Sequence, residues 1–598
     1  MPSPYRIVRN ARLLLQSAAQ HLVDDPALLV VQVSRRLPLR ARVLAGDMVR
    51  ALAGRLPGCA GAAALGAFMA GDDEAAHRHV RRSVGSGSRL GGEVAVLLDR
   101  SDLLTPEAAP ATRARAAWAR GDLTSSLQIL RGSGRGESRY ARRLLSEIRL
   151  LSPGHRLSVP RGDASWATTR EEGALRVLHL LTNSLPHTQS GYSLRSHRIL
   201  TTLRDQNIES VALTRTGYPV MVGLLGAAEE DAVDGIRYVR TLPARLPQTQ
   251  EERLEAEAKR AIELVAEFRP HVIHATTNYY NALVAQAVSA ATGIPWVLEV
   301  RGLMEKTWAA SHSSPRGRRA ALNSEKARLV AARERELASD ASAVVTLSDT
   351  MRAELVDRGV DGAAITVVPN GVEESLLTTR RTPAEARALL GVGMDEAFII
   401  GAVSALVDYE GLDVLIRAVA RLVADASVPQ SLRDRLRVII VGDGQAAPGL
   451  RVLAEELGIG ERLIMPGRVS RHAAPNWVQA LDVVAIPRRD VEVARTVTPQ
   501  KPVEAMALGR PVIVSDLPAL METVTGTGGE ICALIHEADS VEGLADAIIA
   551  LAVDRTRANI LVERGLSAAA ERTWPALIQR YRTMYDEVIT QEESARGR

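Results

Sequence analysis

Short apolar runs that alternate with helical segments constrain the fold of this 598-residue chain more than any other feature. The run LRVLHLLT at 175–182 has no helical period, and a polar loop and the amphipathic segment SLRSHRILTTLRDQ follow it. Later runs repeat this order: ESVALT, VIHAT, WVLEV, AVVTL and TVVP. Strands that alternate with helices predict a parallel sheet whose two faces are covered by helices.

A second series of apolar runs begins near Phe398. Its members are FIIGAVS, RVIIVGDG, RLIMPG, VVAIP, PVIVS and ICALI. The two series predict an α/β chain with two doubly wound, Rossmann-like domains in tandem, at residues 175–388 and 389–570. In such domains the ligand-binding groups lie on loops that follow the carboxyl ends of the strands.

Residues 1–165 differ from the rest, because they combine helical periodicity with a strong basic charge. They contain 25 Arg and 14 Asp or Glu, a net charge of +11. Apolar residues recur every three or four positions, which predicts an all-α region, followed by a linker at 166–174. Gly-Asp pairs at 46–47, 71–72 and 121–122 suit the joints of helical hairpins, since Gly can end one helix and Asp can cap the next. The region is then either a tetratricopeptide-like array or a plain helical bundle.

The composition excludes several classes of protein. Hydrophobic residues make up 46% and charged residues 24% of the chain, which excludes a mainly disordered protein. The two cysteines, Cys59 and Cys532, exclude a disulfide framework and a four-cysteine metal site. No run of about 18 apolar residues is present, so we expect no membrane-spanning helix. The low cysteine count and an N-terminal apolar run too short for a signal peptide predict a cytoplasmic protein. Four of the 74 basic residues are Lys, a bias of GC-rich genomes that fits a bacterial source, so the excess of Arg does not indicate nucleic-acid binding.

The segment TPQKPVEAMALGRPVIVSDLPALMETV at 498–524 resembles the donor-binding helix and following strand of family 4 glycosyltransferases, which have the two-domain GT-B fold. Further pieces occur in the order of that family: SGYSLRS, GIPWVLEVRG, VVTLSDTMRAEL, ITVVPNGVE, YEGLDVLIRAVARL, VGDG and MPGRVS. The resemblance covers about residues 175–570. It implies a retaining hexosyltransferase with a nucleotide-diphosphate sugar as donor, UDP being favoured over GDP, and with no metal or cofactor. It also implies a C-terminal helix, at 571–598, that returns to the acceptor domain.

Glu504 and Lys501 are the main candidates for donor binding. Glu504 lies near a positive helix end, where a carboxylate is favourable. The resemblance assigns its counterpart to the donor ribose, whereas the alternative is a helix-capping Glu. An ammonium such as that of Lys501 is unfavourable at a helix start unless an anion is near, and a bound diphosphate would supply one. The alternative is a solvated surface Lys.

The chain departs from the family pattern at the diphosphate site. The first of two glutamates spaced eight apart is replaced by Thr496, which marks a TPxKPxEAMA subgroup. The usual Arg and Lys after the first strand of the donor domain are replaced by Ser404 and Glu410. Other groups must then balance the diphosphate charge. The candidates are Arg488, Arg489, Lys501 and backbone N–H groups around Thr496 and Thr498.

Three loops complete the expected donor site. Gly191 opens a helix in SGYSLRS, where the backbone can approach a phosphate, and Arg195 either adds charge there or faces solvent. VGDG forms a tight turn in which Gly442 and Gly444 would let the backbone approach the ligand. The resemblance assigns the base to the loop residues Arg468 and Val469.

His274, Glu299 and Arg301 are the candidate catalytic residues of the acceptor domain. His274 corresponds to the first position of a His-x-His pattern in the family, and the alternative is a core histidine. Glu299 and Arg301 point the same way along a strand. They could bind an acceptor hydroxyl or phosphate, or form a structural ion pair.

Two functions from different classes follow. The first is a glycosyltransferase of cell-envelope or extracellular polysaccharide or glycoconjugate synthesis, with a saccharide or lipid-linked saccharide as acceptor. The second is a catalytically silent GT-B scaffold with a basic interaction domain. In either case residues 1–165 could contact an anionic membrane at the inner face of the plasma membrane, or an acidic protein.

Overall fold

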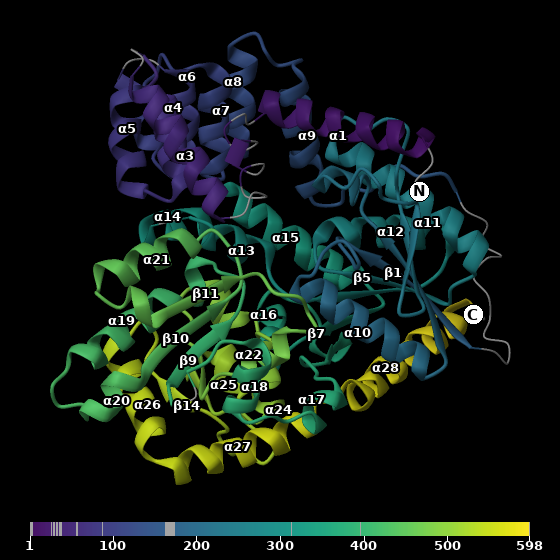
Figure 1. The fold of residues 1–598 in the computed structure, drawn as a ribbon. Helices are drawn as coiled ribbons and strands as arrows, with labels where there is room; N and C mark the ends of the chain where they lie inside the picture. Colours follow the sequence, from purple (N-terminus) through teal and green to yellow (C-terminus); the bar gives the residue numbers. More distant parts are fainter. Residues whose placement is uncertain are drawn as a thin grey trace. The chain divides into compact units, whose positions relative to one another are not determined.

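The computed structural model describes residues 4–24, 39–55, 58–85, 88–161, 174–312, 314–394 and 396–596, together with residues 27, 30, 31 and 34. The chain divides into two compact units, Met1–Val344 with Glu587–Arg598, and Val345–Asp586. Most of the predicted linker, residues 166–173, lies outside the described residues. Figure 1 shows the ribbon coloured along the sequence.

The described part of the N-terminal region is helical, as predicted, and is drawn in purple and blue in Figure 1. Its described helices are α1 (Pro4–Asp24), α3 (Leu39–Gly54), α4 (Ala60–Ala70), α5 (Asp73–Gly85), α6 (Arg89–Leu97), α7 (Pro110–Ala119), α8 (Leu123–Gly132) and α9 (Arg139–Leu151), with the 3-10 turn η1 (Ser101–Leu103). Whether they form a tetratricopeptide-like array stays a prediction.

Two of the three Gly-Asp pairs form helix joints. Gly71 ends α4 with φ 83°, and the Asp72 carboxylate accepts a hydrogen bond of 2.9 Å from the N–H of Ala75. Gly121 has φ 80°, and the Asp122 carboxylate accepts one of 3.1 Å from the N–H of Ser125 at the start of α8. In both joints Gly supplies the left-handed turn and Asp satisfies an N–H group of the next helix.

The prediction was wrong for the Gly-Asp pair at 46–47, which lies inside α3. Gly46 is needed there because α3 packs closely on α4. A Cβ added to Gly46 would lie 2.6 Å from the carbonyl oxygen of Gly66, and a Cβ on Gly66 would lie 2.6 Å from that of Gly46. These two glycines therefore mark a close helix contact.

The first sheet has eight strands in the order β3-β4-β2-β1-β5-β6-β7-β8. The strands are β1 (Leu175–Leu181), β2 (Ile208–Thr214), β3 (Glu230–Val233), β4 (Ile236–Arg240), β5 (Val272–Thr276), β6 (Trp296–Val300), β7 (Ala343–Thr346) and β8 (Ile365–Val367). All six strands predicted for this sheet are present. The boundary between the two units falls within β7.

The apolar runs did not predict β3 and β4, and the expectation of an all-parallel sheet was wrong because β3 pairs antiparallel with β4. Asp234 and Gly235 connect them with φ 46° and φ 76°. A two-residue Asp-Gly loop with positive φ at both positions is a typical hairpin turn. The Asp-Gly dipeptide was therefore the sequence signal that could have predicted this hairpin.

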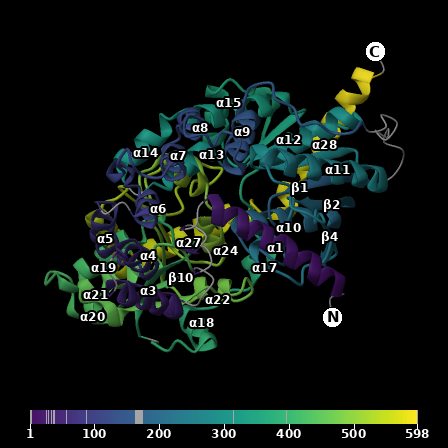
Figure 2. The same ribbon diagram turned by 90° about the horizontal axis from the view of Figure 1, so that it is seen from above.

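Helices and short 3-10 turns connect the strands of the first sheet and lead into the second. They are α10 (Gly191–Asp205), η3 (Val220–Val222), α11 (Gln250–Phe268), α12 (Tyr279–Thr292), α13 (Met304–Ala310), α14 (Pro315–Leu322), α15 (Glu325–Asp340), α16 (Asp349–Asp357), η4 (Gly362–Ala364), α17 (Glu374–Thr378) and α18 (Pro383–Leu390). Seen from above in Figure 2, α9 of the N-terminal region runs beside α15.

The second sheet has six strands, all parallel, in the order β11-β10-β9-β12-β13-β14. They are β9 (Phe398–Val403), β10 (Leu436–Val441), β11 (Leu463–Gly467), β12 (Val483–Ile486), β13 (Val512–Ser515) and β14 (Leu534–His536). All six were predicted, although β14 begins three residues later than the apolar run ICALI. The two doubly wound domains are thus confirmed.

The helices and 3-10 turns of this part of the chain cover the second sheet and then continue to the C-terminus. They are η5 (Asp408–Glu410), α19 (Leu412–Ala424), α20 (Gln430–Arg435), α21 (Ala447–Glu456), η6 (Gly460–Arg462), α22 (Ala474–Gln479), α23 (Glu492–Thr496), α24 (Lys501–Ala507), α25 (Pro518–Thr523), α26 (Val541–Val553), α27 (Arg555–Ala570) and α28 (Trp574–Arg596). Among the described residues, no helix combines the length and the apolar character needed to span a membrane.

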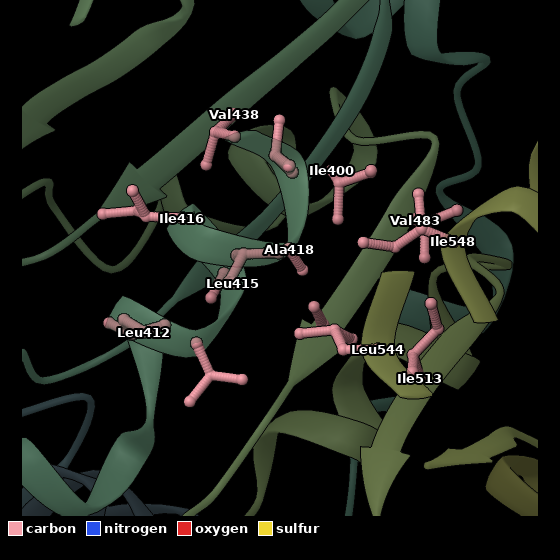
Figure 3. Close-up of a cluster of buried hydrophobic side chains, with 14 of the residues drawn as sticks. Ile400, Leu412, Leu415, Ile416, Ala418, Val438, Val483, Ile513, Leu544 and Ile548 are labelled. Carbon is pink, nitrogen blue, oxygen red and sulfur yellow. The ribbon is translucent and has the colours of Figure 1, made fainter. Parts of the chain in front are cut away.

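Two hydrophobic clusters cover the two faces of the second sheet. On β9, Ile400 belongs to one cluster and its neighbour Ile399 to the other. On β10, Val438 belongs to the first cluster and its neighbour Ile439 to the second. This alternation follows from the two-residue period of side chains along a strand. Figure 3 shows the first cluster, in which Leu415 of α19 and other helical side chains meet the strand residues. Both faces of this sheet are buried, which explains the continuous apolar runs of its strands.

Candidate functional site

Lys501 lies at the centre of a charged group in the second unit that we name the Lys501 cluster: Ser404, Glu410, Arg488 and Lys501. The Lys501 ammonium contacts the Glu410 carboxylate at 2.6 Å and the Ser404 hydroxyl at 2.5 Å. The Arg488 guanidinium donates to the other Glu410 oxygen at 3.0 Å. The alternative of a solvated surface Lys is therefore wrong.

Glu410 supplies the anion that the position of Lys501 at the start of α24 requires. Although burial acts to raise it, the pKa of Glu410 is lowered to about 2 by the charges of Arg488 and Lys501. Burial lowers the pKa of Lys501, and Glu410 opposes that shift. The cluster therefore holds two cations and one carboxylate, a net charge of +1 at neutral pH.

Arg489 does not join this cluster, although sequence analysis counted it among the possible diphosphate ligands. Its guanidinium contacts Asp413 at 2.6 Å and Asp539 at 3.0 Å, and Asp408 lies at 3.6 Å. Three carboxylates thus surround one guanidinium. This charge is compensated inside the protein, so the expectation is corrected for Arg489.

Thr496 is the last residue of α23, Thr498 lies between α23 and α24, and both are buried. The Thr496 hydroxyl donates to the carbonyl of Glu492 in its own helix at 2.8 Å, and the carbonyl of Thr498 accepts from the Asn370 amide at 3.0 Å. Arg488 Nε and Thr498 Oγ1 are buried without a hydrogen-bond partner in the structure. A ligand or a water molecule at this position would complete the hydrogen bonds of both atoms.

Glu504 lies in the first turn of α24 and is half-buried. Its carboxylate accepts a hydrogen bond of 2.8 Å from the Gln500 side-chain amide. The residue at the N-cap position is Gln500, which makes no side-chain cap. The prediction places Glu504 correctly near the helix start, where the Gln500 side chain holds its carboxylate.

Glycine stands at positions 442 and 444 for a structural reason that was not predicted from the sequence. A Cβ on Gly442 would lie 1.8 Å from the carbonyl oxygen of Ser404, and a Cβ on Gly444 would lie 2.1 Å from that of Leu406. The backbone after β9 fills this space. Glycine is therefore required for contact between two loops of the protein, and the expected approach of this turn to a ligand stays a prediction.

Arg468 and Val469 follow Gly467, which ends β11 with φ 87°. Arg468 is exposed and Val469 is half-buried. The carbonyl of Gly467 accepts a hydrogen bond of 3.0 Å from the N–H of Gly442, which ties this loop to the turn after β10. The proposed base-reading loop thus lies at the carboxyl ends of adjacent strands.

In the first unit, a buried network surrounds Glu299, and we name it the Glu299 cluster: His179, Arg195, His274, Glu299 and Arg301. One Glu299 oxygen accepts from Arg195 at 3.1 Å. The other lies 2.8 Å from Arg301 Nη2 and 3.2 Å from His274 Nε2. The ring of His179 stacks on that of His274 with centroids 5.0 Å apart.

Burial shapes the charges of this cluster. It acts to raise the pKa of Glu299, but Arg301 and Arg195 hold that pKa well below its usual range. Burial also lowers the pKa of His179 well below its usual value, so this ring is neutral. A buried carboxylate between two guanidinium groups is an ion-paired arrangement that leaves no uncompensated negative charge.

The expectation that Arg195 faces solvent was wrong, because it is 2% exposed and its guanidinium binds Glu299. His274 and Glu299 are fully buried as well. Arg301 continues the network to α10 by donating to the carbonyl of Tyr192 at 3.0 Å and to the hydroxyl of Ser196 at 2.8 Å. The three candidate catalytic residues are thus brought together, and they are joined to the start of α10.

Gly191 is the first residue of α10, as predicted, and it is exposed. Ser190 caps the helix by accepting from the N–H of Ser193. A Cβ on Gly191 would meet no atom within 4 Å. The open side of this helix start therefore faces away from the protein interior.

Three residues were not predicted from the sequence: His179 of the Glu299 cluster, Ser196, which accepts from Arg301, and Asn370, which donates to Thr498. His179 lies on β1 directly beside His274 on β5, with which it is in register. Ser196 follows Arg195 in α10, and Asn370 lies in the motif ITVVPNGVE. His179 could not be predicted, because separate apolar runs do not reveal that β1 pairs with β5. Asn370 had a signal, because its motif was already part of the resemblance.

Two family models match the chain. Residues 190–371 match the model described as Glycosyl transferase 4-like domain, and residues 397–554 match Glycosyl transferases group 1. The first range contains Gly191, Arg195, His274, Glu299 and Arg301. The second contains the Lys501 cluster. Residues 4–161 lie outside both ranges.

Curated relatives match parts of the chain. A D-inositol 3-phosphate glycosyltransferase of Stackebrandtia nassauensis is 31% identical over 40% of this chain and 53% of its own length. The lipopolysaccharide core biosynthesis mannosyltransferase LpsB of Rhizobium meliloti is 27% identical over 34% of this chain and 56% of its own length. The chain therefore spans little more than half the length of these relatives.

Solved structures match more of the chain at lower identity. The sucrose-phosphate synthase of Thermosynechococcus elongatus has a TM-score of 0.56 at 19% identity, over 70% of this chain and all of its own. HepE of Anabaena, solved with UDP and glucose, has a TM-score of 0.51 at 18% identity, over 69% of this chain and all of its own. At such identities the likeness shows the fold alone. The predicted GT-B fold class is thereby confirmed.

Proposed function

We propose that this protein, whose two sheet domains both match glycosyltransferase family models, is a retaining glycosyltransferase with a nucleotide-diphosphate sugar as donor. The observation that supports the proposal most is the position of the Lys501 ammonium. It contacts Ser404 and Glu410, the two positions at which the family resemblance expects an Arg and a Lys. Lys501, at the start of α24, therefore supplies a cation that the loop after β9 lacks.

In this proposal the donor diphosphate lies beside Lys501 and Arg488. When the glycosidic bond to the leaving group breaks, negative charge builds up on the diphosphate. Cations that are already held in place stabilise this charge more in the transition state than in the ground state, which accelerates the reaction. Glu410 and the carbonyl of Val497 hold the two cations before the donor binds.

The ribose of the donor would lie at Glu504, because a carboxylate can accept hydrogen bonds from two vicinal hydroxyls. The Gln500 amide that now contacts this carboxylate at 2.8 Å would then give way or share it. The loop at Arg468 and Val469 would contact the base through main-chain groups. We propose UDP as the preferred nucleotide over GDP, and no cofactor besides the nucleotide sugar.

On the acceptor side, we propose that His274, Glu299 and Arg301 act through the start of α10. The side chains are buried, and Arg301 holds the Tyr192 carbonyl and the Ser196 hydroxyl. The network fixes the exposed helix start at Gly191, where the N–H groups of the first turn can bind an acceptor hydroxyl or a phosphate oxygen. Acceptor positioning is the role that this geometry supports.

The test of the proposed function is incubation of the full chain with UDP- and GDP-sugars. We expect nucleotide release and a higher melting temperature with a UDP-sugar, and NMR of the product should show that the anomeric configuration is retained. The variant Lys501→Ala should lose both signals. Wild-type protein that releases no nucleotide and is stabilised by no donor would overturn the proposal.

One observation favours a second function. Glu410 cancels one of the two positive charges of Arg488 and Lys501. In addition, Thr496 stands where the family resemblance expects a glutamate. A site weakened in this way suits a catalytically silent GT-B scaffold. If nucleotide sugars fail to bind while residues 1–165 capture a partner protein, this second function is supported.

The acceptor and the location are proposals as well. The D-inositol 3-phosphate glycosyltransferases and the lipopolysaccharide core mannosyltransferase among the relatives favour a polyhydroxylated acceptor of cell-envelope or glycoconjugate synthesis. We propose a bacterial, cytoplasmic enzyme that works at the inner face of the plasma membrane. In this proposal the basic N-terminal region, residues 1–165, makes the contact with the membrane.

A further inference from the structure

Helix α1 has two apolar faces, and one of them packs on the first sheet domain. Leu13 is fully buried in a cluster with Val220, Ala227 and Leu246. On the same face, the Asn10 amide donates to the carbonyls of Leu225 at 2.8 Å and Ala227 at 2.9 Å. This face fixes the helix on the domain that carries the Glu299 cluster.

The opposite face of α1 is apolar and exposed. Val8, Leu15 and Leu22 are 69%, 70% and 58% exposed, and Tyr5 is 74% exposed. Val8, Leu15 and Leu22 are seven residues apart, so they lie in one line along the helix. Single exposed apolar residues are ordinary, but a line of them on one helix marks an interaction surface.

The charge around this apolar line is positive. Arg6, Arg9 and Arg12 lie on the first half of α1, and the first acidic residue of the helix is its last residue, Asp24. Arg12 is exposed on the apolar side, whereas Arg9 is paired with Glu229. The whole region 1–165 has a net charge of +11. An occupant of this surface must therefore offer apolar contact and negative charge together.

We propose that the exposed face of α1, formed by Tyr5, Val8, Arg12, Leu15 and Leu22, binds the surface of an anionic lipid bilayer. A helix with an apolar face and arginines lies in the plane of the interface, with its apolar side chains among the acyl chains. Arginine near the surface is attracted to anionic headgroups. Because the other face of α1 is fixed on the first sheet domain, binding would bring that domain to the membrane.

Other occupants of the face fit the observations less well. A second copy of the chain would bring two regions of net charge +11 together, which is unfavourable. An acidic protein could satisfy the charge. However, a straight line of aliphatic side chains along a convex helix matches a fluid apolar layer better than the shaped pocket that a protein anchor needs.

The test uses the full chain and vesicles of phosphatidylcholine with or without phosphatidylglycerol. We expect the wild type to sediment with the mixed vesicles and much less with pure phosphatidylcholine, and added salt should weaken binding. The variant Leu15→Asp/Leu22→Asp should bind the mixed vesicles at least about tenfold more weakly, because two apolar side chains no longer insert.

A matched control keeps the result specific. Leu389 and Val452 are 58% and 53% exposed on other helices, so Leu389→Asp/Val452→Asp removes similar apolar area outside α1. This control should bind vesicles as the wild type does. Both variants should keep the wild-type melting temperature, since the substituted side chains face solvent.

Several outcomes would overturn the inference. One is equal binding of the Leu15→Asp/Leu22→Asp variant and the wild type, and another is equal loss in the control. Absence of vesicle binding by the wild type would point to an acidic protein. A wild-type dimer that this variant converts to a monomer would point to a second copy. The readout is vesicle binding, so failure of the glycosyl-transfer proposal leaves the test intact.

Discussion

The charge balance of the Lys501 cluster depends on Glu410, which stands where the family resemblance expects a cation. The carboxylate has a pKa of about 2 and stays ionised at every pH at which an enzyme of this kind would work. It holds Lys501 and Arg488 in place, and it also competes with any bound phosphate for their charge. A substitution that removes only the negative charge of Glu410 should separate its positioning of the two cations from its competition with phosphate.

We therefore predict that Glu410→Gln binds UDP more tightly than the wild type. The substitution keeps the shape and an acceptor oxygen but removes the negative charge of the cluster, which strengthens attraction to a diphosphate. Isothermal titration calorimetry should show roughly a tenfold gain, or about 1.4 kcal/mol. Weaker binding would mean that Glu410 acts mainly by positioning the two cations.

Lys501→Ala should lower kcat/KM roughly 100- to 1,000-fold, the usual effect of removing one group that stabilises transition-state charge. Steady-state kinetics with the donor found in the screen would measure it. Lys259→Ala is the control, because Lys259 is an exposed lysine in α11. Wild-type kinetics for Lys501→Ala would remove this residue from the mechanism.

Glu299→Gln should destabilise the protein at pH 7 by about 3–5 kcal/mol, because it leaves two buried guanidinium groups without their counter-charge. The pKa of Glu299 is lowered in the folded state, so its contribution is present above the unfolded value near 4.3 and is lost as the pH falls. Urea unfolding should show the gap between the wild type and the variant narrowing below about pH 5. A gap independent of pH would contradict an ion-pair role.

At the scale of elements, close backbone contacts decide where glycine stands. The pair α3 and α4 approach each other at Gly46 and Gly66, whereas Gly132 at the end of α8 has open space around its Cβ position. The two kinds of helical glycine look alike in the sequence. Their substitution should have opposite effects.

Gly66→Ala should destabilise the helical region by about 1–3 kcal/mol, because the new methyl group overlaps the Gly46 carbonyl and α3 must move. Gly132→Ala should be neutral or stabilise by about 0.4–1 kcal/mol, since it only reduces the entropy of the unfolded chain. Thermal unfolding followed by circular dichroism compares the two. Equal effects would show that α3 and α4 are not in close contact.

At the scale of the whole molecule, the N-terminal helical region is joined to the first sheet domain by polar contacts. The Lys326 ammonium of α15 lies 3.3 Å from the Glu147 carboxylate of α9 and 3.7 Å from the centre of the Trp118 ring. The Glu325 carboxylate accepts from the N–H of Thr124 at 2.8 Å. Residues outside both family models are thus fixed on a domain within them.

Lys326→Ala should loosen this attachment by about 1–2 kcal/mol, the range for a desolvated cation over an aromatic ring. Hydrogen exchange should then increase in α8 and α9 while the second sheet stays unchanged. The exposed Lys259→Ala again serves as control. Unchanged exchange in α8 and α9 would show that the attachment does not depend on Lys326.

Local sequence patterns were enough to predict the strand–helix alternation, both doubly wound domains and the helical N-terminal region. These follow from local patterns, because burial on both faces of a parallel sheet demands continuous apolar runs. The sequence also placed Lys501 and Glu504 at a helix start. The Asp-Gly hairpin at 234–235 was equally local, and it was missed although its signal was present.

Which charged side chains pair with one another depends on the packing of distant segments. Glu410 with Lys501, Glu299 with Arg195, and Arg489 with three aspartates are pairs between residues that lie far apart in the sequence. A local sequence pattern reveals the periodicity of one segment. It does not reveal which distant segment packs against that one. Compensation of a buried charge depends on the partner that packing brings within about 3 Å, and that partner is set by the topology of the sheets.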